Sequence, residues 1–272
     1  MRFTVIAAAL ACATTVLGAP GTAIRRERAA RRLAQRSSRT RQPATDGGVL
    51  SITELRNDTE THVQYSSNWA GAVLIGNGYT SVTGVITVPT PKTPSGGSSS
   101  TEYAASAWVG IDGDTCETAI LQTGVDFFVQ GSSVSFSAWY EWYPDYSYDF
   151  SGLAIDAGDE IRMTVSATGG GKGGKAIVEN LTTGKSASHS FSNESDVLCE
   201  TNAEWIVEDF SSSDSLVPFA DFDTVTFTDA SVTTGSGKVG VTGATIMDIR
   251  QNNKILTKCG TSGSSSVTCS YV

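Results

Sequence analysis

The stretch Thr201-Asn-Ala-Glu-Trp-Ile-Val-Glu-Asp-Phe210 decides the fold of this chain, together with Ala119-Ile-Leu-Gln-Thr-Gly-Val-Asp126. Both segments have the apolar content of buried β-strands, yet each carries carboxylates or a carboxamide among its apolar residues. Such a group in the interior of a sheet costs several kcal/mol unless it has a hydrogen-bonding partner. These side chains are therefore expected either to bond to one another or to take part in chemistry.

The two-residue period of a β-strand assigns these polar side chains to faces. In the first stretch Glu204 and Glu208 share one face, and Trp205 points to the other. In the second stretch Gln122 shares a face with Gly124, and the glycine is expected to leave room for a ligand. The polar groups of each strand thus lie together, although either strand taken alone is equally consistent with a solvated sheet edge.

A third segment, Ala138-Trp-Tyr-Glu-Trp-Tyr-Pro-Asp-Tyr-Ser-Tyr-Asp-Phe150, combines aromatic and acidic residues. On a strand, Trp139 and Glu141 point to one face, and Tyr140 and Trp142 point to the other. A glutamate flanked by tryptophans indicates the wall of a substrate site. A core strand with one charged residue at its rim fits the composition equally well.

Residues 65–272 are rich in Thr, Ser, Val and Gly and show no 3.6-residue periodicity. Short strand-like runs separated by glycine turns predict an all-β fold. We expect a β-sandwich of two large antiparallel sheets, of the lectin-like jelly-roll type, with a cleft on one concave face. The predicted strands are Thr80–Val88, Tyr103–Ile111, Ala119–Val129, Ser133–Tyr143, Glu160–Ala167, Lys175–Leu181, Glu204–Phe210, Thr224–Thr228, Val239–Ile249 and Val267–Val272.

The first residues have the features of a secretory signal: a basic start, an apolar run from Thr4 to Leu17, and small residues at Gly18 and Ala19. The apolar run is too short to span a bilayer. We therefore assign residues 1–19 to the signal peptide of a secreted, extracellular protein that has no membrane-spanning segment.

A basic segment follows the signal. Eight arginines and one acidic residue, Glu27, lie between Ile24 and Arg41. This composition predicts a solvated, partly helical arm with too few apolar residues for a core. Nucleic acid is not an expected partner on a secreted chain. We interpret residues 20–64 as a propeptide removed near Tyr65, ahead of a catalytic domain of residues 65–272.

The distribution of charge supports this division. Ten Lys and Arg and five Asp and Glu precede residue 65, so of 19 basic and 28 acidic residues nine and 23 remain, a net charge of −14. A basic leader pairs with an acidic domain at neutral pH, and acidification weakens the pairing. The leader is therefore predicted to be a pH-released inhibitor of its own domain, which is expected to be a monomer.

Four cysteines follow the signal peptide, an even number in an oxidising compartment, and they allow three pairings. Cys259 and Cys269 bracket a Gly-Ser turn in the manner of a hairpin clip. This favours the pairs Cys259–Cys269 and Cys116–Cys199. The spacings match no zinc pattern, so no metal site is predicted.

Residues 65–272 give little support for catalysis by a histidine or a serine. His189 lies in a polar segment that predicts a surface position, and no G-x-S-x-G elbow supplies a nucleophile for a triad. Thiol catalysis is not expected when the cysteines are paired. The remaining prediction is carboxylate chemistry without a cofactor.

Other classes of protein carry acidic and aromatic residues on a β-sandwich. A glycoside hydrolase of this fold uses two carboxylates in an aromatic-lined cleft, for which Glu141 and Glu208 are the candidates. A non-catalytic, lectin-like module also accounts for the aromatic residues, but it does not account for a removable basic leader.

Five segments resemble motifs of the fungal glutamic peptidases, the eqolisins, and they occur in that family's order. The segments are Ser66–Gly71, Ala107–Asp114, Ile120–Asp126, Trp139–Asp145 and Asn202–Asp209. The signal and the basic leader also match the layout of that family's precursors. The resemblance covers residues 65–272 and implies a secreted acid endopeptidase that hydrolyses proteins and peptides without a metal or other cofactor.

The resemblance assigns catalysis to Gln122 and Glu208, and the alignment selects Glu208 rather than Glu204. Glu208 is expected to take a proton from water and to pass it to the leaving amine. Gln122 is expected to donate to the developing oxyanion. The positions that the resemblance implies around the cleft, as contacts for substrate, are Trp69, Asp112, Asp126, Trp139, Glu141 and Asp149.

The chain departs from the family's pattern in two places. Ser137 stands where members carry an aspartate that supports hydrogen bonds in the cleft, which puts the acid optimum and the rigidity of the site in question. Ala104 and Phe128 stand where relatives carry a cysteine pair. The pair is absent as a unit, and the clip at Cys259–Cys269 is expected to compensate for it.

Overall fold

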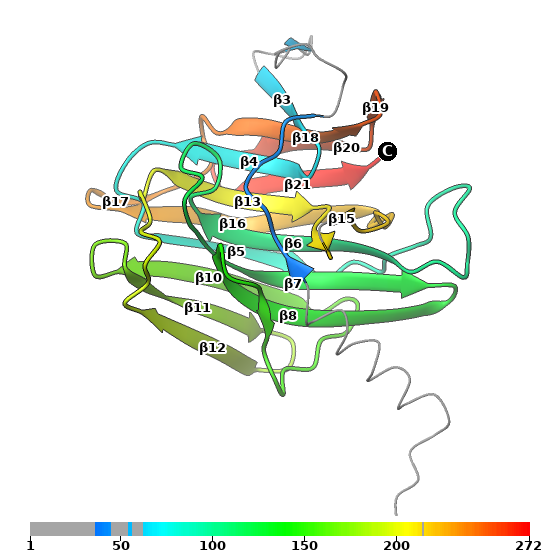
Figure 1. Ribbon diagram of the computed structural model, residues 1–272, viewed down its shortest axis with the longest axis horizontal. Coiled ribbons are helices and arrows are strands. Elements are labelled where there is room, and N and C mark those ends of the chain that lie inside the picture. The colour runs from blue at the N-terminus through cyan, green and yellow to red at the C-terminus, as the bar shows by residue number, and fades with distance from the viewer. Residues whose placement is uncertain (1–35, 45–53, 56–61, 214) are drawn as a thin grey trace, which may run out of the picture.

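Strand pairing organises the chain that the computed structural model describes, which comprises residues 36–44, 54–55, 62–213 and 215–272. Two large sheets pack face to face, as Figure 1 shows, so the predicted all-β sandwich is confirmed. Within these residues the structure has no helix, and hence none long and apolar enough to cross a membrane. The predicted signal peptide, residues 1–19, lies outside the described residues.

The larger sheet has ten strands. Their spatial order is β2 (Glu54–Leu55), β3 (His62–Ser66), β18 (Thr245–Gln251), β4 (Trp69–Ile75), β13 (Asn202–Glu208), β6 (Tyr103–Ile111), β7 (Ile120–Gln130), β8 (Ser133–Tyr143) and β9 (Tyr148–Asp149), with β19 (Lys254–Ile255) beside β18. Strand β3 runs parallel to β18, and the other neighbours are antiparallel. This sheet contains the polar strands that the sequence singled out, β13, β7 and β8.

The second sheet has eight strands. Their spatial order is β12 (Lys185–Ser192), β11 (Gly173–Asn180), β10 (Glu160–Thr168), β5 (Ser81–Thr87), β16 (Thr224–Thr234), β21 (Ser266–Tyr271) and β20 (Thr257–Ser262), with β17 (Gly237–Val239) beside β16. A separate three-stranded sheet joins β1 (Arg36–Ser37), β14 (Ser211–Ser212) and β15 (Ser215–Leu216). The leader therefore contributes a strand to this small sheet.

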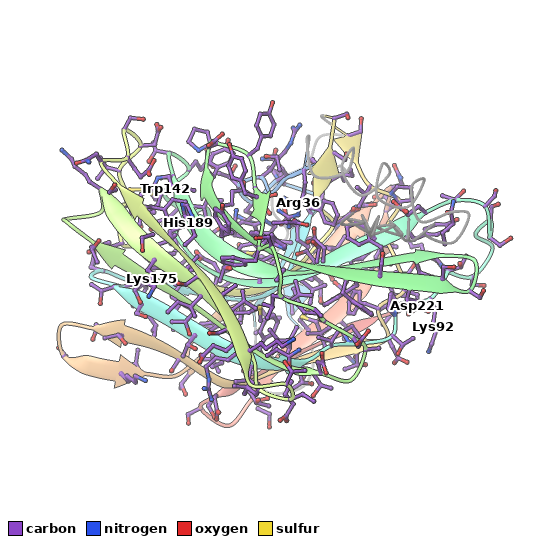
Figure 2. All side chains as sticks on the ribbon, turned by 90° about the horizontal axis from the view of Figure 1, so that it is seen from below. Arg36, Lys92, Trp142, Lys175, His189 and Asp221 are labelled. Atoms are coloured by element: carbon purple, nitrogen blue, oxygen red, sulfur yellow. A yellow bond between two sulfur atoms is a disulfide. The ribbon has the colours of Figure 1, made fainter. Side chains whose placement is uncertain are left out.

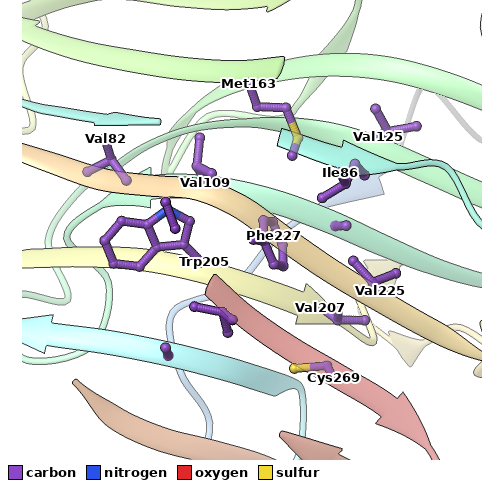
Figure 3. Close-up of a cluster of buried hydrophobic side chains, with 14 of the residues drawn as sticks. Val82, Ile86, Val109, Val125, Met163, Trp205, Val207, Val225, Phe227 and Cys269 are labelled. Carbon is purple, nitrogen blue, oxygen red and sulfur yellow. The ribbon is translucent and has the colours of Figure 1, made fainter. Parts of the chain in front are cut away.

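The hydrophobic core fills the space between the inner faces of the two large sheets (Figure 3). Trp205 is fully buried there, and its indole N–H donates to the carbonyl of Thr83 at 2.8 Å across the sandwich. Gly84 lies under the ring, where a Cβ would be 3.1 Å from Trp205 Cδ1. A side chain at Gly84 would therefore require the indole of Trp205 to move by a few tenths of an ångström. Truncating a buried tryptophan of this kind costs about 3–5 kcal/mol.

A second apolar cluster lies on the opposite, outer face of the larger sheet. Its members are Trp69, Val73, Trp108, Ile120, Trp139, Ile206 and Met247. The predicted alternation is confirmed on β13, where Ile206 joins this outer cluster while Trp205 and Val207 join the core. It is also confirmed on β8, where Trp139 is outside and Trp142 inside. The outer face thus combines tryptophans with the polar groups of the same strands.

Two predicted strands differ from the structure. The run predicted to end at Thr228 continues in β16 beyond Asp229, whose left-handed φ of 52° lies at a β-bulge rather than at a strand end. The predicted strand Val239–Ile249 is two strands, β17 and β18, separated by a turn in which Gly243 has a φ of 83°. In each case a residue with positive φ sets the local geometry.

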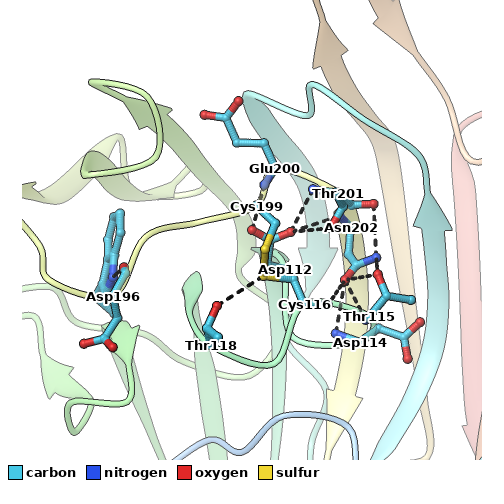
Figure 4. Close-up of a disulfide and its surroundings, with 11 residues drawn as sticks. Asp112, Asp114, Thr115, Cys116, Thr118, Asp196, Cys199, Glu200, Thr201 and Asn202 are labelled. Atoms are coloured by element: carbon cyan, nitrogen blue, oxygen red, sulfur yellow. Dashed lines mark hydrogen bonds between the residues drawn. A yellow bond between two sulfur atoms is a disulfide. The ribbon is translucent and has the colours of Figure 1, made fainter.

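Both predicted disulfides are confirmed. Cys259 pairs with Cys269 across the β20–β21 hairpin, and Cys116 pairs with Cys199, which is 83 residues away in the chain. Figure 4 shows the second disulfide beside Asp112, where it ties the loop after β6 to the segment that leads into β13. A grouping of potential metal ligands at this place consists of Asp112 and these two cysteines, and the S–S bond uses both sulfur atoms.

The leader is not the solvated, partly helical arm that its composition predicted, at least over the part that the structure describes. Residues 36–44 are extended, and Arg36, Ser38 and Thr40 are buried. In Figure 1 this segment, drawn in blue, starts beside β6 and β7 and crosses the outer face of the larger sheet. Burial of Arg36 requires carboxylates in the face beneath it, and the site supplies these.

Candidate active site

The register of the larger sheet arranges side chains of the outer face in rows across the strands. In one row Glu208 of β13 lies opposite Ser106 of β6, and Ser106 lies opposite Asp126 of β7. Asp126 lies opposite Ser137 of β8 in the same row. The pairing of strands that are distant in sequence thus brings Glu208 and Asp126 to one place.

A parallel row lies four residues further along each strand. It runs from Glu204 through Gly110 and Gln122 to Glu141. All three side chains are fully buried, and both amide atoms of Gln122, both oxygens of Glu204 and Oε1 of Glu141 have no hydrogen-bonding partner among the described residues. A buried polar group without a partner costs about 1–3 kcal/mol. Gln122 therefore has hydrogen-bonding capacity that is free for a ligand.

Two indoles separate these rows. Trp108 and Trp139 lie on either side of Gly124, and a Cβ at Gly124 would come within 2.5 Å of the Cβ of Trp108 and 2.8 Å of the Trp139 ring. The prediction that Gly124 leaves room for a ligand was wrong, because the indoles fill this space. Glu208 and Gln122 thus share one face, with Trp108 and Trp139 in the row between them.

The Glu208 carboxylate accepts several hydrogen bonds. Trp108 Nε1 donates to its Oε2 at 2.9 Å, and the backbone N–H of Arg39 and Nδ2 of Asn68 donate to Oε1 at 3.3 and 3.5 Å. Burial raises the pKa of Glu208 from its ordinary value of 4.5 to about 7, although the positive charge of Arg36 and the hydrogen bonds act to lower it. A carboxyl group with such a pKa can exchange a proton near neutrality.

Arg36 of the leader occupies the other end of the Glu208 row. Its Nε and Nη2 donate to the two oxygens of Asp126 at 2.6 and 3.0 Å, and Nη1 donates to Glu141 Oε2 at 3.3 Å. The guanidinium carbon lies 3.7 Å from the Trp139 ring centroid and 4.8 Å from that of Phe210. This buried guanidinium is held by charge, by a bidentate fit and by two aromatic faces.

Leader residues 38–41 make further contacts along the outer face of the larger sheet, as far as Asp114. The backbone N–H of Ser38 donates to Glu141 Oε2 at 3.3 Å, and the carbonyl of Arg39 accepts from Trp69 Nε1 at 3.0 Å. Arg41 Nη1 lies 3.5 Å from Asp114 Oδ1. The leader thus places backbone and basic groups against several of the residues that the sequence assigned to the cleft.

Asp149 joins the site through Ser137. The Ser137 hydroxyl donates to Asp149 Oδ2, and β9 places Asp149 opposite Trp139. Burial raises the pKa of Asp149 to about 6, against the effect of the Ser137 hydrogen bond, and the charge of Asp126 raises it further. The hydroxyl at Ser137 therefore bonds a carboxylate in a place where a second carboxylate would have added negative charge.

Asp112 is the one predicted site residue that lies apart from the others. Its carboxylate accepts hydrogen bonds from the backbone N–H groups of Glu200, Thr201 and Asn202 at 2.8–3.1 Å, as Figure 4 shows. Asp112 itself has a φ of 69°, the left-handed conformation that aspartate tolerates in turns. The carboxylate orders the turn that leads into β13, and its oxygens do not face the row of Glu208.

Sequence reasoning missed several groups of the site. Asn68 and Trp108 lie within motifs that were recognised, beside Trp69 and before Asp112, yet nothing local showed that they bond Glu208. Arg36 was counted only as part of a basic run. The excess of arginines over acidic residues in the leader was the available signal. It predicted attraction between the leader and the acidic domain, but it did not show which arginine enters the site.

His189 lies away from this constellation. Its ring stacks on Tyr140 with centroids 4.1 Å apart and contacts Phe191 edge-on at 4.7 Å. Figure 2 shows His189 beside Trp142, well separated from Arg36. The half-buried histidine packs among aromatic rings on the inner side of β8, opposite to the face that carries Glu208.

Fold and site together define a β-sandwich protein that carries a buried carboxylate, Glu208, and a carboxamide without a hydrogen-bonding partner among the described residues, Gln122, beside tryptophans on one face. The chain belongs to the Peptidase A4 family, whose model matches residues 67–271, and it is a glutamic endopeptidase of the eqolisin group. The resemblance seen in the sequence is thereby confirmed. Membership decides against the glycoside hydrolase and the lectin-like module.

Relatives match along the whole chain. The sequence is 53% identical to Aspergillopepsin-2 of Aspergillus niger and 45% identical to Scytalidopepsin B of Scytalidium lignicola, in each case over 100% of both chains. A crystal structure of scytalido-glutamic peptidase with a transition state analog inhibitor is 50% identical, with a TM-score of 0.68, and covers 76% of this chain and 98% of its own. The crystal structure of aspergilloglutamic peptidase from Aspergillus niger is 61% identical, with a TM-score of 0.60, and covers 62% of this chain and 99% of its own.

Proposed function

We propose that the chain is the secreted precursor of an acid endopeptidase in which Glu208 and Gln122 hydrolyse peptide bonds. The ionised Glu208 carboxylate takes a proton from water, and the resulting hydroxide attacks the substrate carbonyl. The N–H of Gln122 donates to the oxyanion of the tetrahedral intermediate. Glu208 then passes its proton to the nitrogen as the C–N bond breaks, which yields a carboxylic acid and an amine.

The observation that carries this proposal is the pair of unpartnered atoms on the Gln122 amide, on the same buried face as the Glu208 carboxylate. A preorganised oxyanion donor contributes about 2.7–4 kcal/mol to the transition state. A carboxamide keeps its N–H at any pH, so this donor works in acid. Acid also neutralises part of the −14 charge of residues 65–272, which favours activity at low pH.

We infer that residues 20–64 are an inhibitory leader and that residues 65–272 are the mature domain. The described leader residues cover Glu208 by donating the Arg39 N–H to it, and this burial favours the protonated carboxyl, which cannot act as a base. Arg36 fills the space beside Asp126 and Glu141. Residues 1–19 would direct export, and the substrates would be proteins and peptides, bound by a monomer.

The test is cleavage of a denatured protein across pH 2–7 by the acid-treated chain, with pepstatin and EDTA controls. Glu208→Gln and Gln122→Ala are expected to lose activity by at least 100-fold, and the matched Glu204→Gln variant is expected to retain it. Full activity in Glu208→Gln would exclude the proposed pair. The N-terminus of the active species in the culture medium is expected near residue 65, and an active protein that retains the leader would contradict inhibition.

A further inference from the structure

A third apolar cluster lies on the outer face beyond Asp126, on the side away from Gln122. It consists of Ala104 on β6, Phe128 on β7 and Phe210 after β13, with Val217 packed against them. Phe128 and Phe210 meet edge to face, with centroids 6.2 Å apart. These residues form a cluster separate from the sandwich core and adjoin the cleft.

A cavity of about 90 Å³ opens at this cluster. Its lining is Arg36, Glu102, Ala104, Asp126, Phe128, Phe210, Ser212, Val217 and Pro218. One of its walls is therefore the leader's own Arg36, and the other walls belong to the catalytic domain. Departure of the leader would join the space now held by the Arg36 side chain to this cavity.

The leader enters this place by strand addition. Arg36 and Ser37 pair antiparallel with Ser212 and Ser211 of β14. An extended substrate backbone can use the same edge, because main-chain pairing is independent of sequence while side-chain pockets select residues. A substrate residue paired as Arg36 is paired would point its side chain between the Trp139 and Phe210 rings.

The contacts of Arg36 indicate which side chains of a substrate would fit in the space that Arg36 occupies. A planar group fits between the two rings, since the guanidinium carbon lies 3.7 and 4.8 Å from their centroids. The adjoining walls from Ala104, Phe128 and Val217 are apolar. Burial raises the pKa of Glu141 well above its ordinary value, so acid protonates Glu141 and reduces the advantage of arginine in this aromatic-lined pocket.

We propose that Ala104, Phe128, Phe210 and Val217, together with Trp139, form a specificity subsite that takes a large aromatic or aliphatic side chain of the substrate. The subsite lies at the place of Arg36, three residues from the position whose N–H meets Glu208 at Arg39. This inference rests on the proposed peptidase function and names a substrate preference of the same cleft.

The experiment is a peptide series with Phe, Leu, Arg or Ala at each position up to four residues from the cleaved bond, on either side, at pH 4. At one position, three or four residues from the bond, Phe or Leu is expected to raise kcat/KM at least tenfold over Ala, as burial of a large apolar side chain predicts. Ala104→Leu, which fills the cavity, is expected to bring that ratio to within twofold.

Controls separate the outcomes. Val134→Leu enlarges an exposed apolar residue of β8 and is expected to leave the ratio unchanged, and Val217→Phe tests the cavity from its other wall. An unchanged preference in both cavity variants, no preference in the parent enzyme, or a preference for Arg at pH 4 would overturn the subsite. Failure of the parent to cleave any peptide would instead overturn the proposed function.

Discussion

Replacing Arg36 by methionine in the leader isolates the ion pair that anchors the leader in the cleft. The side chains of Arg36 and Asp126 are 3% and 2% exposed, so the substitution leaves a buried carboxylate without its cation. Breaking a buried pair in this way costs about 3–5 kcal/mol, which is roughly 150- to 5,000-fold in a dissociation constant. Methionine keeps most of the aliphatic volume, so the loss reports the charge rather than packing.

The assay is inhibition of the acid-activated enzyme by a peptide of residues 20–64, added in trans at the highest pH at which the enzyme still cleaves a fluorogenic peptide. Arg41→Met is the matched control, because Arg41 lies 3.5 Å from Asp114 and its side chain is 23% exposed. A partly exposed pair is worth about 1 kcal/mol or less, or roughly fivefold. Equal losses for the two variants, or a loss below tenfold for Arg36→Met, would refute the argument from burial.

The same inhibition constants depend on pH with a sign that the site determines. Burial raises the pKa of Glu141 well above its ordinary value, and a proton on Glu141 removes part of the negative charge that Arg36 meets. Glu208 acts in the opposite sense, because the leader-covered carboxyl, with a pKa of about 7, gains a proton when the leader binds. The Arg36→Met leader also lacks the charge that lowers the pKa of Glu208, so Glu208 binds a proton more readily beneath that leader. Both effects make the ratio of the inhibition constants of the Arg36→Met and parent leaders shrink as pH falls. A ratio that grows in acid would contradict this sign.

Three further predictions concern the domain itself. Trp108→Phe removes the 2.9 Å hydrogen bond to Glu208, so the pKa of that carboxyl rises further. The acid limb of the kcat/KM profile is therefore expected to move up by about 1–2 pH units. An unchanged acid limb would show that the indole does not act on the catalytic carboxyl. Asp112→Asn weakens the hydrogen bonds to the turn before β13 and is expected to lower the free energy of unfolding by about 2–3 kcal/mol, or the Tm by roughly 5–10 °C. The kcat per folded molecule is expected to stay unchanged. A lower kcat with an unchanged Tm would show that Asp112 takes part in catalysis. Replacing Cys116 and Cys199 by serine opens a loop of 83 residues and is expected to cost about 4–5 kcal/mol in a denaturant titration, whereas a loss below about 1 kcal/mol would show that loop closure contributes little.

Local patterns in the sequence predicted the faces of the strands. The period of two predicted that Trp205 lies on the face of β13 opposite to Glu208 and that Trp139 lies on the face of β8 opposite to Trp142, because alternation is a property of a single strand. The turn between Cys259 and Cys269 was equally local. Recurring strand-like runs with glycine turns predicted the all-β class, and the family motifs supplied the expectation of a glutamic peptidase.

Predictions from local patterns were wrong at positions whose surroundings come from other strands. Gly124 was expected to leave room for a ligand, but Trp108 from β6 and Trp139 from β8 occupy that room. Asp112 lies in a recognised motif, yet its oxygens are used by the backbone of a segment about 90 residues later. Neither outcome follows from a segment read on its own, because each depends on which strands pair.

The sequence by itself determined the all-β class, which residues of β13 and of β8 share a face, and the basic charge of the N-terminal segment against an acidic remainder, and it favoured the disulfide pairs that the structure has. The tertiary structure alone decided that Trp108 bonds Glu208 across 100 residues of chain and that Arg36 meets Asp126 across 90. Alternation and turns are fixed by neighbouring residues, whereas these contacts depend on register between distant strands. A shift of one residue in that register would turn Asp126 to the opposite face and leave the leader arginine without its partner.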